Sequence, residues 1–230
     1  ADRIARHRGF ARNDLDAYGL RSQLLAQRAW ADRRFDGHVI PVAVPNGDRA
    51  EAIVDSDEGL RDTSMEALAM LPPVKDGGLH TAGTSSQVSD GASAALLMSE
   101  GRAGLLGMAP KAQLLAQCVV GGDTELMLDG PVAAATELFE RTAMTVADID
   151  LFEVNEAFAS IPMSFAAALG VDDDRLNVNG GAIALGHPTG ATGIRLLANA
   201  IDELKRRDGQ IAMVAICAAA ATTCLILERL

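Results

Sequence analysis

The amino-acid sequence predicts an α/β fold built around a mixed β-sheet. From about Asp90 onward, short apolar runs typical of buried strands alternate with helical stretches, and two apolar strands in succession end the chain. Of the 230 residues, 49% are hydrophobic but only 3% are aromatic, so small aliphatic side chains must form the core. A chain of this length can bury one sizeable core or two smaller ones, and such side chains favour tight packing of helices on a sheet.

The elements of this α/β region follow from hydrophobic periodicity. Helices are expected at residues 101–107, 131–142, 157–169 and 193–207, with Pro131 in a first turn, where proline is favoured. Strands are expected at residues 94–98, 112–120, 149–154, 176–178, 210–217 and 223–228. Alternating strands and helices that end in a hairpin indicate both parallel and antiparallel pairing, and therefore a mixed sheet.

The first 90 residues have a different pattern. Residues 1–35 alternate apolar and charged positions like helices, and Asn13 is a candidate N-cap. Residues 38–44 resemble a strand, which Pro41 would confine to a sheet edge. The polar stretch that follows, rich in Pro, Gly and Asp, allows one short helix near residues 64–71. We therefore expect an irregular excursion here rather than a self-sufficient core.

Composition and charge exclude several classes of function. The formal net charge of −11 argues against nucleic acid as a partner, because phosphate backbones require clustered Lys and Arg. Cys118, Cys217 and Cys224 lack zinc-like spacing, which predicts free thiols in a cytoplasmic protein without a metal site. No signal peptide and no apolar run of about 20 residues is present, so we expect no membrane span.

Polar residues at the ends of three expected strands form a candidate site. His187 lies between Gly186 and Pro188, which restrict the backbone around the ring, while Asn155 and Cys217 end two other strands. Active sites of α/β folds gather at the carboxyl ends of strands, so these side chains are expected to converge. His, Asn and Cys together indicate thiol or acyl chemistry. A dinucleotide site is a poor alternative, because the glycine spacing after Gly186 does not fit G-x-G-x-x-G.

Four sequence segments carry a resemblance to a known family. They are N-V-N-G-G-A-I-A-L-G-H-P-T-G-A-T-G-I-R at 177–195, E-V-N-E-A-F-A at 153–159, T-A-G-T-S-S-Q-V-S-D-G-A at 81–92, and Gly130-Pro131. In this order they resemble motifs of the thiolase family. The resemblance implies a thiolase-like layered fold with helices on both sides of the mixed sheet and the N-terminal half absent. It divides the chain into a loop domain (1–90), a strand and helix of the absent N-terminal core (91–110), and a C-terminal core domain (111–230).

The resemblance also implies an activity, namely thiolytic cleavage of 3-ketoacyl-CoA or the reverse Claisen condensation of acyl-CoA. His187 would accept the proton of a nucleophilic cysteine, and Asn155 would fix a water at the first oxyanion site. Cys217 would move a proton at the substrate, and the amide of Ala219 would serve a second oxyanion site. Acyl-CoA and CoA would be substrates, with no covalently bound cofactor. The acyl-CoA-binding residues would be Ser86, Phe158, Gly186 and Met127.

Two departures from the family leave alternatives open. The nucleophilic cysteine belongs to the absent half, and Cys118 cannot replace it because it lies in the middle of an apolar strand. The glycine-rich turn expected after the second cysteine is Cys217-Ala-Ala-Ala-Ala221, whose methyl groups would crowd the thioester. The chain is therefore expected to be one part of a thiolase, which associates as a homodimer or homotetramer. A non-catalytic acyl-CoA-binding or scaffold subunit is the alternative, and a CoA-independent binding protein is a third.

Overall fold

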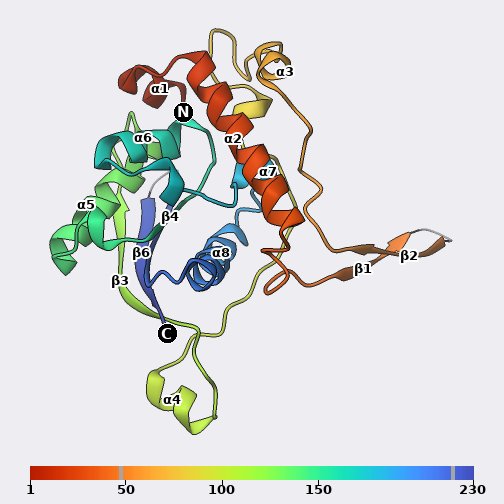
Figure 1. The fold of residues 1–230 in the computed structure, drawn as a ribbon. Helices are drawn as coiled ribbons and strands as arrows, with labels where there is room; N and C mark the ends of the chain where they lie inside the picture. Colours follow the sequence, from red (N-terminus) through yellow and green to blue (C-terminus); the bar gives the residue numbers. More distant parts are fainter. Residues whose placement is uncertain (47–48, 219–220) are drawn as a thin grey trace.

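A four-stranded mixed sheet forms the centre of the computed structural model, which describes residues 1–46, 49–218 and 221–230 (Figure 1). The strand order is β3-β6-β5-β4. β4 and β5 are parallel, whereas β6 runs antiparallel to both of its neighbours. The predicted mixed sheet and terminal hairpin are therefore confirmed. The strands are β3 (Ala112–Gly121), β4 (Leu151–Val154), β5 (Ile211–Cys217) and β6 (Ala221–Arg229).

Helices cover both faces of this sheet, as Figure 1 shows. Helices α5 (Gly130–Thr142) and α6 (Ser160–Leu169) lie on one face, and α8 (Thr192–Arg207) lies on the other. The alternation of side chains along a strand explains the division. Phe152 of β4 packs with the α5 and α6 side chains, while the preceding Leu151 packs with those of α8. Each face thus has its own apolar core.

The N-terminal region lies beside the sheet rather than in it. Helices α1 (Asp2–Arg8) and α2 (Arg12–Ala31) confirm the helical prediction, and α2 packs against α7 (Ala182–Leu185). The predicted cap at Asn13 was wrong. The N-cap is Ala11, whose backbone N–H donates to the Asp14 carboxylate over 2.8 Å. An acidic residue in the first turn takes over the capping role here, because it both accepts the free amide and faces the positive helix end.

The stretch after α2 projects from the body as a two-stranded hairpin of β1 (Val42–Asn46) and β2 (Arg49–Val54) (Figure 1). The strand predicted at residues 38–44 therefore begins later than expected and, within the described part of the chain, pairs with β2 alone. The short helix predicted near 64–71 is α3 (Met65–Ala69). Its N-cap Ser64 accepts a hydrogen bond from the amide of Ala67.

Two predicted strands were wrong. Residues 94–98 form no strand, and Leu96 and Leu97 are 73% and 71% exposed. No neighbouring strand lies alongside them within the described residues, and a strand requires one to pair its amides. The helix predicted next is present as α4 (Glu100–Leu105). Residues 176–178 form isolated bridges, from Leu176 to Phe152 and from Val178 to Gly180, because Asn177 adopts a left-handed φ of 46° and turns the chain away.

None of the helices in the described part of the chain is long and apolar enough to cross a membrane.

Candidate functional site

Three segments that are far apart in the sequence lie side by side at one edge of the sheet. The amide of Ser86 donates to the carbonyl oxygen of Ala157 over 3.0 Å, and the amide of His187 donates to that of Gln87 over 3.1 Å. The segment 84–87 therefore lies between the chain that follows β4 and the loop that contains His187. The sequence motifs at 81–92, 153–159 and 177–195 thus form one continuous structure.

His187 and Asn155 are in direct contact. Nδ2 of Asn155 lies 3.2 Å from Nε2 of His187, and Nδ1 of His187 lies 2.7 Å from the hydroxyl oxygen of Thr192. That hydroxyl donates to the carbonyl oxygen of Pro188 over 3.0 Å, so it accepts a hydrogen bond from Nδ1–H of His187. Nε2 then carries the lone pair and accepts from the Asn155 amide. This arrangement fixes both the tautomer and the orientation of the ring.

The environment of this pair favours the neutral imidazole. Partial burial lowers the pKa of His187, because the protonated ring would lose hydration that the site does not replace. Asn155 is 1% exposed, and its Oδ1 has no hydrogen-bond partner among the residues that the structure describes. A buried amide oxygen without a partner is uncommon. It is a free acceptor beside the imidazole, suited to a bound water.

Cys217 lies at the same edge of the sheet. The amide of Asn155 donates to the carbonyl oxygen of Ala215 over 3.0 Å, which extends the pairing of β4 with β5 and aligns Asn155 with the end of β5, where Cys217 lies. The Cys217 side chain is 7% exposed, and burial raises the pKa of its thiol to about 11. Cys217 is therefore a protonated thiol at neutral pH, able to donate a proton rather than to act as a thiolate.

Cys118 is confirmed as a core residue. It is 6% exposed in β3, its thiol points at the carbonyl oxygen of Ala134 in α5, and burial raises its pKa. Ala219, predicted to offer an oxyanion amide, lies outside the described residues. Among residues 1–46, 49–218 and 221–230, no group of three or more His, Cys, Asp or Glu side chains is arranged to hold a metal ion.

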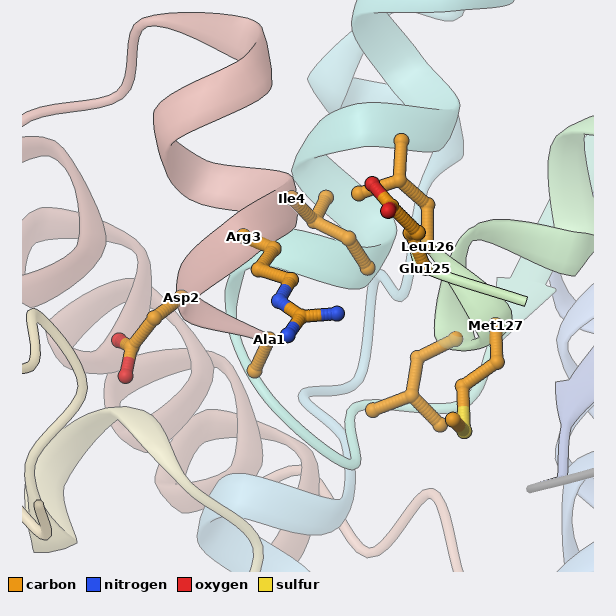
Figure 2. Close-up of a pocket in the computed structure, with 8 residues that line it drawn as sticks. Ala1, Asp2, Arg3, Ile4, Glu125, Leu126 and Met127 are labelled. Carbon is orange, nitrogen blue, oxygen red and sulfur yellow. The ribbon is translucent and has the colours of Figure 1, made fainter. Parts of the chain in front are cut away.

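The predicted acyl-CoA-binding residues fall into two places. Ser86 and Phe158 lie in the paired segments next to Asn155, and the ring of Phe158 packs edge-on against His80 at 5.3 Å. Met127 lies instead beside a cavity of about 280 Å³ between α1 and the turn before α5. Figure 2 shows it facing Arg3 across this cavity.

The glycines near His187 make close contacts within the chain. A Cβ on Gly181 would lie 2.3 Å from Cδ of Glu156, and one on Gly186 would lie 2.2 Å from the hydroxyl oxygen of Ser89. Gly186 also has a φ of 88°, a conformation that side-chain-bearing residues rarely adopt. For these two glycines, the neighbouring side chains already account for the absence of a Cβ.

Sequence reasoning missed two residues that hold the site together. Thr192 lies just outside the helix expected at residues 193–207 and was given no role, although it is the first residue of α8 and its hydroxyl orients His187. Glu156 follows Asn155 directly and is fully buried, with its carboxylate hydrogen-bonded to α2 and to α7, the helix just before the His187 loop. A charged residue within an otherwise apolar segment was the signal available, since a buried carboxylate needs partners.

Comparison with known proteins assigns this constellation to a family. Residues 108–229 match the family described as "Thiolase, C-terminal domain", and residues 1–101 match "Thiolase, N-terminal domain". The chain belongs to the thiolase family. The resemblance noted from the four motifs is therefore confirmed.

Individual thiolases are similar along nearly the whole chain. A 3-ketoacyl-CoA thiolase of Marinomonas sp. is 40% identical over 223 residues, which cover 94% of this chain and 57% of that protein. An acetyl-CoA acetyltransferase of Syntrophomonas wolfei is 38% identical over 226 residues, covering 96% of this chain and 57% of that protein. This chain thus spans a little more than half the length of these thiolases.

Solved thiolase structures confirm the layered fold. The crystal structure of the Bacillus anthracis acetyl-CoA acetyltransferase matches with a TM-score of 0.96 at 33% identity, covering 100% of this chain and 59% of that one. The human mitochondrial 3-ketoacyl-CoA thiolase matches with a TM-score of 0.92, also at 33% identity, covering 100% of this chain and 58% of that one.

Proposed function

We propose that this chain supplies the proton-transfer half of a thiolase-type acyltransferase that acts on acyl-CoA thioesters. The observation that carries the proposal is the His187 ring, held by Thr192 on one side and Asn155 on the other, at the sheet edge where Cys217 ends β5. The names of the similar proteins, 3-ketoacyl-CoA thiolase and acetyl-CoA acetyltransferase, support the same chemistry.

In the thiolytic direction, a cysteine thiol from the N-terminal half of a thiolase loses its proton to Nε2 of His187. The thiolate attacks the 3-keto carbon of the substrate, and the bond between C2 and C3 breaks. The departing carbanion of acetyl-CoA takes a proton from the thiol of Cys217. The thiol of CoA returns a proton to Cys217, attacks the acyl-enzyme thioester and releases the first cysteine, which recovers its proton from His187.

The geometry suits both proton-transfer roles. A base that is neutral at working pH and oriented through its second nitrogen is ready to accept a proton without a change of tautomer. A thiol with a pKa of about 11 stays protonated until a stronger base, such as a carbanion next to a thioester, removes its proton. A water bound between Asn155 and His187 would complete a donor pair for the thioester oxygen.

The partner required by this proposal is the N-terminal half of a thiolase, in the same polypeptide or in a separate one. Several large apolar side chains on β3 and on the segment before it are exposed, and a monomer rarely leaves so many uncovered. They are Val88, Leu96, Leu97, Leu105, Leu114 and Val119. We propose that the N-terminal half covers them. The division into residues 1–90, 91–110 and 111–230, and assembly as a homodimer or homotetramer, belong to this proposal.

The test is an assay of the chain co-expressed with the N-terminal segment of a full-length relative. Cleavage of acetoacetyl-CoA by CoA is expected from the purified complex and should fall by about 10²–10⁴ with His187→Ala, the range for loss of a general base. His7→Ala, at an exposed residue of α1, is the matched control. Full turnover with His187→Ala would contradict the proposal.

One observation favours a second candidate, a non-catalytic acyl-CoA-binding subunit. Alanine stands at positions 219 and 221, where the family resemblance implies glycines and an oxyanion amide at position 219. Calorimetry with CoA and acetyl-CoA distinguishes the candidates. Tight binding by the complex without turnover would support the binding subunit, and the absence of CoA binding would contradict both.

A further inference from the structure

The carboxylate of Glu156 accepts four hydrogen bonds although it is fully buried. Its Oε1 accepts from the Tyr18 hydroxyl over 2.9 Å and from Nδ2 of Asn177 over 3.1 Å. Its Oε2 accepts from the Ser22 hydroxyl over 2.6 Å and from the amide of Ile183 over 3.2 Å. Burial raises the pKa of this carboxyl, while these donors act in the opposite direction and favour the ionised form.

These donors come from three separate parts of the fold. Tyr18 and Ser22 belong to α2, Asn177 lies in the chain that follows η4 (Asp173–Arg175), and Ile183 belongs to α7. The Ser22 hydroxyl oxygen also accepts from the amide of Gly181 over 3.2 Å. Glu156 therefore joins α2 to α7, and His187 lies only two residues after Leu185, the last residue of α7.

Asn177 connects Glu156 to the backbone on which Asn155 is carried. Nδ2 of Asn177 bonds to Glu156 and to the carbonyl oxygen of Val154, and Oδ1 of Asn177 accepts from the amide of Val154 over 2.8 Å. The side chain of Asn177 thus holds both neighbours of Asn155, Val154 and Glu156. Without these contacts of Glu156, Asn155 and the His187 loop would no longer be held to the same part of the fold.

We propose that Glu156 is the positioning residue of this site, which sets the separation between Asn155 and His187 by clamping both of their segments to α2. The inference rests on the proposed function for its catalytic meaning, but the contact that it explains is structural. Glu156 touches no reacting atom in this proposal.

A carboxylate is needed because all four partners donate. In Glu156→Gln the side-chain amide brings its NH₂ group to one of the two oxygen positions. The hydroxyls of Tyr18 and Ser22 can rotate and accept, but the amide of Ile183 and the NH₂ group of Asn177 cannot. Either orientation of the glutamine therefore places its NH₂ group against one donor that cannot accept, the amide of Ile183 in α7 or the NH₂ group of Asn177.

The test is the titration of His187 in the 230-residue chain, followed by ¹⁵N NMR of the imidazole nitrogens. In the wild-type chain we expect a midpoint below the ordinary value of about 6.5 and a neutral ring protonated at Nδ1. With Glu156→Gln we expect the midpoint of the His187 titration to rise toward about 6.5, because the loop no longer buries the ring against Asn155. We also expect the ¹⁵N signals of Nδ1 and Nε2 to move toward each other, because the tautomer is no longer fixed. The folded state is verified by circular dichroism.

Glu203→Gln is the matched control. Glu203 is also a buried carboxylate, 1% exposed, but it accepts hydrogen bonds from Arg206, Arg207 and Asn179 at the far end of α8. Glu203→Gln should lower the stability of the folded chain without changing the midpoint of the His187 titration. An unchanged midpoint in folded Glu156→Gln, or an equal shift in both variants, would overturn the inference.

If Glu156→Gln does not fold, Tyr18→Phe gives the same test with a smaller expected shift, because it removes a single donor. None of these readouts depends on turnover. Failure of the acetoacetyl-CoA assay would therefore leave the positioning role intact, and failure of the NMR test would leave the acyltransferase proposal intact.

Discussion

Nε2 of His187 faces the side-chain amide of Asn155 at 3.2 Å, on the opposite side of the ring from Thr192. The imidazole is therefore held through both nitrogens by residues of two different segments, one after β4 and one in the first turn of α8. Either contact can be removed separately, which makes their contributions measurable.

Thr192→Val removes the acceptor for Nδ1–H while keeping the shape of the side chain. Loss of one hydrogen bond worth about 0.5–1.5 kcal/mol should lower kcat in the co-expressed complex by about 2–10-fold. Without the hydroxyl, the proton is no longer held on Nδ1, so Nε2 is no longer the nitrogen that preferentially carries the lone pair. Thr192→Ser keeps the hydroxyl and should retain most of the activity. Equal losses in both variants would show that the methyl group, rather than the hydrogen bond, is what matters.

Gly181→Ala should destabilise the chain by about 1–3 kcal/mol or more, the usual range for overpacking a rigid interior. The new methyl would lie 2.3 Å from Cδ of Glu156, whose carboxylate is held by four donors and has no room to move. Gly190→Ala is the control, since a Cβ there meets no atom within 4 Å. Urea unfolding measures both, and equal midpoints would contradict the close packing described here.

Stability should fall as the pH is lowered from about 7.5 to about 5.5. Burial lowers the pKa of His80, with a hydrogen bond to Thr84 and the nearby Asp2 acting in the opposite direction. The folded chain therefore binds fewer protons than the unfolded one below pH about 6.5, so protonation favours unfolding. His187, whose pKa is also lowered, adds to the effect.

His80→Gln should remove part of this dependence, although it also disturbs the hydrogen bond to the Ser160 hydroxyl. The measurement is the slope of unfolding free energy against pH, from urea titrations of each variant. His7→Gln, at an exposed residue of α1, should keep the wild-type slope. A wild-type slope in His80→Gln would rule out this residue as a source.

The three cysteines should react slowly with a thiol reagent in the folded chain at pH about 8. All are buried, and burial raises the pKa of each thiol above its ordinary value. Both effects reduce the accessible thiolate. Full reaction is expected only in guanidinium, measured by absorbance after addition of Ellman's reagent. Rapid labelling of Cys217 in the native chain, identified by peptide mass, would contradict the protonated, enclosed thiol that the proposed mechanism uses.

Much of the fold could be predicted because local pattern and tertiary structure agree. Helix α8 and strands β3, β5 and β6 follow from periodicity, since each packs an apolar face against the sheet or lies within it. Residues 94–98 have an equally apolar sequence but form no strand, because strand formation depends on a neighbour and not on composition. Asn177 shows the same limit, since its left-handed φ depends on contacts made by its side chain.

The site was predictable only in part, for a related reason. His187 and Asn155 stand in distinctive sequence settings, and the topology brings strand ends to one edge. Tyr18, Ser22 and His80 have no such setting. Their roles arise from distances between segments, such as the 2.6 Å from Ser22 to Glu156 across 134 sequence positions. No spacing rule along one chain contains that information.

The contact between Glu156 and Gly181 also bears on how the sequence can change over time. A methyl group at position 181 is excluded while the carboxylate is in place, and loss of the carboxylate leaves its four donors without an acceptor. Gly181→Ala and loss of the Glu156 carboxylate are each harmful alone. A tolerated combination of the two must also change the residues that donate hydrogen bonds to the carboxylate. Descendants of this protein are therefore expected to keep both residues or to replace the whole group together, which makes the pair a marker of inheritance independent of the chemistry nearby.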